Sequence, residues 1–188
     1  GAIPWRRGDF AKAVEWNRRA ADIDKAAHGE VSTQHAARLK NLGAVYVDWA
    51  RATGNADLHR KEQECLEQAA RITRALRGPR HPEMAATFNN LAVMAADAGD
   101  MDRAAEKMAQ AVAVDLSLDQ LAHPETQRQM TELHTFWTQS GQTDKAARLA
   151  AGDASDLIPV IRQIEDEHRA WVAEDPDTRH FGPPSRFC

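Results

Sequence analysis

The apolar side chains between residues 78 and 119 recur at helical spacing. They form two stripes on either side of Gly99, and each stripe has the three- and four-residue steps of one helix face. The first stripe contains Phe88, Leu91, Ala92 and Ala95, and the second contains Ala104, Met108, Ala111 and Val114. The pattern predicts two amphipathic helices joined at a glycine turn. One hairpin cannot bury both stripes alone, so we expect it to stack on similar hairpins.

The same hairpin pattern recurs at a fixed period. The run His-Pro-Glu starts at His81 and again at His123, and Gly99 returns as Gly141, each after 42 residues. Self-similarity at such a period is typical of stacked repeat proteins rather than of a compact enzyme core. Alanine is abundant, which favours closely packed helices, and no alternating run of β-branched residues predicts a strand. We therefore predict an all-α solenoid of antiparallel helix hairpins.

The repeats divide the chain into six parts. We predict a half repeat with only a second helix over 1–28, full repeats over 29–77 and 78–119, a degenerate repeat over 120–154, a capping helix over 155–173 and an irregular tail over 174–188. The first helix of 29–77 is expected to be about one turn longer, because 13 residues separate Asn41 from Gly54 but only 9 separate Asn90 from Gly99. The half repeat indicates either a chain that starts inside a longer array or an unusual N-terminal cap.

Capping residues place several helix ends. His81 and His123 each precede a Pro-Glu pair, and proline fits the first helical position, so both histidines are predicted N-caps. Ser155 is the predicted N-cap of the capping helix. The tail contains three prolines and no periodicity, so we expect it to be irregular, with Phe181 and Phe187 as its apolar anchors.

Composition and charge exclude several classes of function. The net charge of -4 has both signs interspersed, so no basic surface for nucleic acid is expected. No apolar run approaches the roughly 18 residues of a membrane span. The two cysteines, Cys65 and Cys188, form neither a disulfide framework nor a metal motif, and they fit a reduced, cytoplasmic setting. Eight scattered histidines give no metal-ligand spacing, and no nucleophile or phosphate-binding motif appears. We therefore expect no catalytic residue, no metal and no cofactor.

These residues resemble the tetratricopeptide repeat family. Leu91, Ala92, Gly99 and Ala104 match its pattern of Leu, small residue, turn glycine and alanine, while Tyr46 supplies the family's aromatic position in the first full repeat. The 42-residue period and the run His-Pro-Glu…Asn-Asn-Leu-Ala are similar to the kinesin-light-chain-like branch. The stretched first repeat and the missing Asn pair of the third repeat depart from the pattern.

The resemblance implies a right-handed superhelix whose first helices line a concave groove for extended peptides. The implied peptide-binding residues are Lys40, Asn41, Ala44, Asn89, Asn90, Val93, Asp97, Arg128, Thr131 and Thr135. Asparagine suits this role because its amide both donates to and accepts from a peptide backbone. The alternative is that Asn89 and Asn90 bond neighbouring helices. Capture of a ligand carboxylate by Lys40, Asn90 and Arg128 is a further reading, which Glu132 opposes by repulsion.

The sequence therefore predicts a non-enzymatic scaffold that binds a protein or peptide ligand. The alternative is a regulatory or sensor region of a larger enzyme or signalling protein. Self-association through the open N-terminal end or through the tail is a further expectation about partners.

Overall fold

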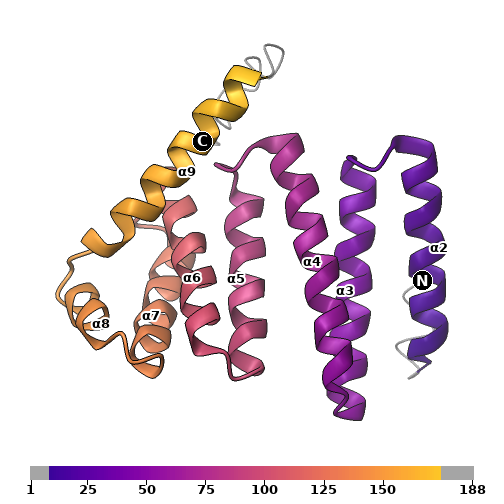
Figure 1. Ribbon diagram of the computed structural model, residues 1–188, viewed down its shortest axis with the longest axis horizontal. Helices are drawn as coiled ribbons and strands as arrows, with labels where there is room; N and C mark the ends of the chain where they lie inside the picture. Colours follow the sequence, from indigo (N-terminus) through magenta and orange to yellow (C-terminus); the bar gives the residue numbers. More distant parts are fainter. Residues whose placement is uncertain (1–8, 175–188) are drawn as a thin grey trace.

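The computed structural model describes residues 9–174, and every regular element in this part of the chain is a helix. A single helix, α2 (Phe10–His28), comes first (Figure 1). Three hairpins follow, formed by α3 (Thr33–Thr53) with α4 (Ala56–Arg77), α5 (Pro82–Asp97) with α6 (Met101–Ser117), and α7 (Pro124–Gln139) with α8 (Thr143–Ala150). A short 3-10 turn, η1 (Ser155–Leu157), leads into α9 (Ile158–Glu174). The predicted all-α array of antiparallel hairpins is confirmed.

Some of the sequence predictions concern residues before 9 or after 174, which the structure does not describe. The N-terminal residues 1–8 and the predicted tail beyond Glu174, with Phe181, Phe187 and Cys188, lie outside the described residues. The predicted longer first helix is present, since α3 has 21 residues and α5 has 16.

The predicted histidine caps are confirmed at both positions. His81 Nδ1 accepts the backbone N–H of Glu83 at 3.2 Å, and His123 Nδ1 accepts that of Glu125 at 3.3 Å. The prediction for Ser155 is wrong. Its backbone N–H instead donates to Asp153 Oδ1 at 2.9 Å, and the chain passes through η1 before α9 starts. The side chain that accepts a backbone N–H before this last helical segment is therefore that of Asp153, two residues before the predicted Ser155.

The core lies between the helices of each hairpin and between successive hairpins. Leu42 and Leu91 are each 5% exposed and Ala104 is 0% exposed, as the predicted stripes require. Met108 of α6 packs with Leu133 and Trp137 of α7 in one cluster, which joins the second full hairpin to the third.

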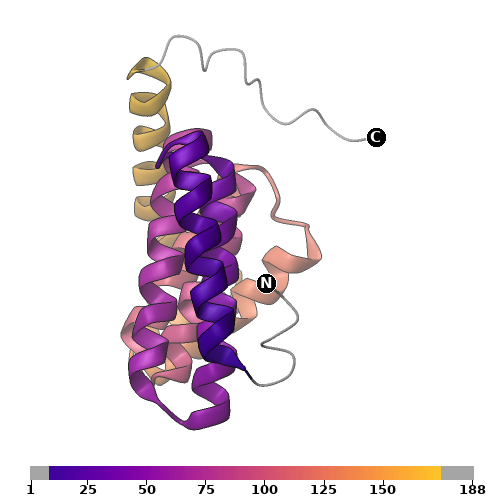
Figure 2. The same ribbon diagram turned by 90° about the vertical axis from the view of Figure 1, so that its right-hand side faces the viewer.

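The last helix, α9, folds back across the second helices. Ile164 is buried in one cluster with Ala70 of α4 and Val114 of α6. Near the far end of α9, the indole N–H of Trp171 donates to the carbonyl of Ala75 at 3.1 Å. Figures 1 and 2 show α9 running obliquely along one side of the array. Because α9 packs against the second helices α4 and α6, the first helices α3, α5 and α7 keep a solvent-facing surface.

Candidate functional site

We call the solvent-facing side chains of α3, α5 and α7 the first-helix face. The ten sequence-predicted site residues all belong to these three helices. Eight of the side chains are exposed and two are half-buried, as expected for residues that lie off the core stripes. The exposed ones are Asn41, Ala44, Asn90, Val93, Asp97, Arg128, Thr131 and Thr135, and the half-buried ones are Lys40 and Asn89.

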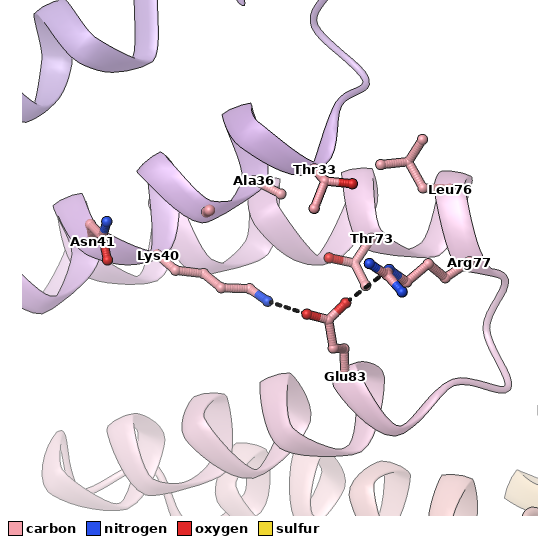
Figure 3. Close-up of a pocket in the computed structure, with 9 residues that line it drawn as sticks. Thr33, Ala36, Lys40, Asn41, Thr73, Leu76, Arg77 and Glu83 are labelled. Carbon is pink, nitrogen blue, oxygen red and sulfur yellow. Dashed lines mark hydrogen bonds and ion pairs between the residues drawn. The ribbon is translucent and has the colours of Figure 1, made fainter. Parts of the chain in front are cut away.

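A pocket of about 220 Å³ lies at one end of this face, between α3, the end of α4 and the start of α5 (Figure 3). Its lining consists of Thr33, Ala36, Ala37, Lys40, Asn41, Thr73, Leu76, Arg77 and Glu83. The pocket thus combines a small apolar wall with charged groups from three helices. Of the predicted site residues, Lys40 and Asn41 contribute to it.

Glu83 lies between two cations in this pocket. Its Oε1 is 3.5 Å from Lys40 Nζ, and its Oε2 is 3.2 Å from Arg77 Nε (Figure 3). The carboxylate neutralises one of the two positive charges, so the three groups together keep a net charge of +1. Ion pairs from Lys40 and Arg77 to Glu83 therefore connect the first full repeat to the second at the pocket.

His81 caps α5 beside this charged group. Burial lowers the pKa of His81, and the nearby positive charge of Arg77 lowers it further. A neutral imidazole keeps a lone pair on one ring nitrogen, and His81 Nδ1 uses it to accept the N–H of Glu83. The cap therefore helps to hold Glu83 in place between the two cations.

Among residues 9–174, the side-chain amides of α5 have no hydrogen-bond partner on neighbouring helices. Within the described residues, neither Asn89 nor Asn90 makes a hydrogen bond through its side chain, and Asn89 Oδ1 is enclosed without a donor. A buried acceptor without a donor is unfavourable by about 1–3 kcal/mol. Within residues 9–174, this pair therefore makes no hydrogen bond to an adjacent helix, as the alternative interpretation would require.

The α7 part of the face is internally satisfied. Arg128 pairs with both Glu125 and Glu132 of its own helix, with 3.1 Å between Arg128 Nε and Glu125 Oε2. The hydroxyls of Thr131 and Thr135 donate to backbone carbonyls one turn earlier, at 3.0 and 3.1 Å. Arg128 is therefore already paired with two carboxylates of its own helix, whereas Lys40 pairs with Glu83 at the other end of the face.

Sequence reasoning missed the pocket residues that α4 and α5 contribute, above all Arg77 and Glu83. The two lie on either side of the turn at Gly78, and their spacing of six residues follows no helical register. Only the stacking of hairpins brings Lys40, 43 residues before Glu83 in the chain, to the same carboxylate.

Two classes of site are absent from the part of the chain that the structure describes. Among residues 9–174, no three His, Cys, Asp or Glu side chains gather where they could share a metal ion. No helix in the same range combines the length and the apolar content that a membrane span requires.

Comparisons with known proteins agree with this architecture. Residues 57–117, which run from α4 to the end of α6, match the family model described as tetratricopeptide repeat. A crystal structure of the nearly identical TPR-like repeats of a Podosopora anserina putative kinesin light chain is similar at a TM-score of 0.63 and 18% identity, over 94% of this chain and 84% of that chain. BtubC (BKLC) from P. vanneervenii is similar at a TM-score of 0.59 and 19% identity, over 98% of this chain and 64% of that chain.

No curated protein matched the sequence of the chain. Identities this low establish a shared fold and nothing about partners. Tetratricopeptide repeats are in general protein–protein interaction modules, and solenoids of this kind bind through extended surfaces. Residues 57–117 thus match the tetratricopeptide repeat model, and the chain has a fold similar to kinesin light chain-like repeat structures.

Proposed function

We propose that this chain is a protein-interaction module that binds an extended peptide or partner segment on its first-helix face. The observation that carries the proposal is the set of unengaged amides on adjacent first helices. Asn41 of α3 and Asn90 of α5 are exposed and make no side-chain hydrogen bond within the described residues. An amide offers both donors and an acceptor, which is what an extended peptide backbone requires.

The surroundings of these amides favour a peptide over a rigid, flat surface. Ala44 and Val93, which lie three residues after Asn41 and Asn90, are exposed and small or medium in size. They leave room for the side chains of a bound segment. The pocket at the α3 end adds a site about the size of one side chain or chain end.

Charge in the pocket favours some ligand ends over others. Lys40 and Arg77 together outweigh the single carboxylate of Glu83. A neutral polar or acidic group is therefore the better occupant of the pocket, and a basic group is disfavoured. On α7, Arg128 is already neutralised by Glu125 and Glu132, so that end adds little charge selectivity.

The proposal is tested by selecting peptides on the wild-type chain from a displayed random library and titrating the selected peptides. The test variant carries Asn41→Ala and Asn90→Ala. Each lost hydrogen bond is worth about 0.5–1.5 kcal/mol, so the double variant should bind roughly tenfold or more weakly. Its thermal midpoint should barely change, because both side chains are exposed.

The matched control truncates two exposed side chains of α4, Glu64 and Arg71, which make no hydrogen bond or ion pair within the described residues. Glu64→Ala with Arg71→Ala should leave the affinity unchanged. If the selected peptides bind the Asn variant as tightly as the wild type, the binding site is not the first-helix face.

A further inference from the structure

The first described helix, α2, carries an apolar stripe on its solvent side. Ile23 is 66% exposed and Trp16 is 47% exposed. Ala20 and Ala27 complete the stripe at steps of four, three and four residues. These steps place all four side chains on one face of the helix. The buried side of α2 flanks this stripe and includes Asn17 and Ala21, which are 7% and 5% exposed.

The equivalent stripe of α4 is a closed helix–helix seam. Both helices end at a capping glycine, Gly29 in α2 and Gly78 in α4, whose N–H donates to the carbonyl four residues earlier at 2.9 Å. Alignment on these two glycines matches Trp16 with Cys65, Ala20 with Ala69, Ile23 with Ile72 and Ala27 with Leu76. The first three α4 residues are 8%, 0% and 5% exposed.

The partner of the α4 stripe is the first helix of its own hairpin. Ala69 and Ile72 pack with Leu39 of α3, and Cys65 packs with Leu42 of α3. A position that α3 buries in α4 is therefore open to solvent in α2.

Comparison of α2 with α6 of the second full repeat, aligned at the N-terminal ends of the two helices, identifies the same face of α2. Gly8-Asp9 before α2 corresponds to Gly99-Asp100 before α6, which matches Ala20 with Ala111 and Ile23 with Val114. Ala111 and Val114 are both 0% exposed. Two alignments that start at opposite ends of α2 thus agree on which face of the helix is left without a packing partner among residues 9–174.

We propose that α2 is the second helix of a hairpin, and that its Trp16–Ala27 stripe binds an amphipathic α-helix of the first-helix type, antiparallel to α2. The occupant carries the chemistry that fills this seam elsewhere in the array, namely two large apolar side chains three residues apart among small ones, as at Leu39 and Leu42 in α3 or Phe88 and Leu91 in α5. This surface lies on α2, apart from the first-helix face, so it does not depend on the proposed peptide site.

The test supplies such a helix in its natural register. A copy of residues 82–98 is placed directly before Gly8 of the otherwise complete chain, in place of residues 1–7. The copied helix then has the same spacing to α2 as α5 has to α6. Burial of two large apolar side chains should raise the thermal midpoint by roughly 5 °C or more, with the protein monomeric in light scattering.

Two control variants show whether the stripe is responsible. Ile23→Lys should abolish the gain in the grafted chain but leave the midpoint of the ungrafted chain nearly unchanged, because Ile23 is 66% exposed there. A grafted helix that carries Leu91→Lys should not raise the thermal midpoint, because a charged side chain then replaces the leucine that would pack against α2.

A second arm does not depend on folding of the graft. A synthetic peptide of residues 82–98 is added to the complete chain, and hydrogen exchange of the α2 amides is followed. Slower exchange in the wild type but not in Ile23→Lys supports the proposal. Unchanged exchange overturns it. So does a dimer of the complete chain that Ile23→Lys dissociates, because a second copy would then fill the stripe.

Discussion

Replacement of Gly78 by alanine tests where α9 lies. Gly78 ends α4 with φ +80° and ψ 166°, a conformation that is essentially restricted to glycine. An added Cβ would lie 2.9 Å from Cε3 of Trp171 and 3.2 Å from Nδ1 of His168, both on α9. Gly78→Ala must therefore strain the backbone and also push α9 away from the corner between α4 and α5.

Gly29 provides a matched control for the backbone contribution. It ends α2 with φ 87° and ψ 165°, and an added Cβ meets nothing within 4 Å. Strain of this kind costs about 1–3 kcal/mol, and it applies equally to Gly29→Ala and Gly78→Ala. The difference between the two variants therefore isolates the contact with α9.

The contact with α9 has two parts that can be estimated. Displacement of Trp171 breaks its hydrogen bond to the carbonyl of Ala75, worth about 0.5–1.5 kcal/mol. Overpacking of a filled site costs a further ~1–3 kcal/mol. The free energy of unfolding should therefore fall by about 1.5–4.5 kcal/mol more for Gly78→Ala than for Gly29→Ala.

Urea unfolding followed by circular dichroism measures both variants. Trp171→Ala removes the closest contacts and leaves the one with His168 Nδ1, so in that background the excess cost of Gly78→Ala over Gly29→Ala should shrink. Equal losses for the two single glycine variants in the wild-type background would refute the packing of α9 against this corner.

Two further predictions concern the core. Leu91→Ala should lower the free energy of unfolding by about 2–5 kcal/mol, whereas Val93→Ala, at a 39% exposed position, should change it by less than about 0.5 kcal/mol; urea titration of both variants checks this. Burial raises the pKa of Glu62 above its ordinary value of 4.5, so the folded protein holds the proton on this carboxyl more tightly than the unfolded chain does. The resulting contribution to stability is fully present below about pH 4.5 and is lost as the pH rises through the raised pKa. The wild type should therefore lose stability relative to Glu62→Gln as the pH rises above about 4.5, and a constant difference in urea titrations across this rise would contradict the burial of this carboxyl.

The hairpins could be predicted from the sequence because their determinants are local. The turn at Gly99, the cap at His81 and the spacing of Leu91 within its stripe all involve residues only a few positions apart. These features recur after 42 residues, so the clear pattern of 78–119 can be used to assign the helices of the degenerate repeat over 120–154. This reasoning placed the buried face of each helix, and by elimination the exposed face that carries the candidate site.

The chemistry of the site was less predictable, for two different reasons. The pairing of Lys40 with Glu83 depends on how two hairpins stack, and no local pattern encodes that geometry. Neutralisation of Arg128 was visible in principle, because Glu125 and Glu132 stand three residues before it and four after it on the same helix. That spacing alone argues against Arg128 as a cation that is available to bind a ligand.

The position of α9 was not predicted, yet α6 carries a signal for it. A helix that contacts neighbours on one side only needs a single apolar stripe, whereas a helix covered on several sides is apolar over more of its surface. Besides the predicted stripe, α6 has Ala109, Val112 and Ala113, and all three are buried. Ala113 lies in the cluster that contains Ile164 of α9. The excess of small apolar residues on α6 therefore indicates a third packing partner, and the short α8, with eight residues, leaves α9 as the helix long enough to supply it.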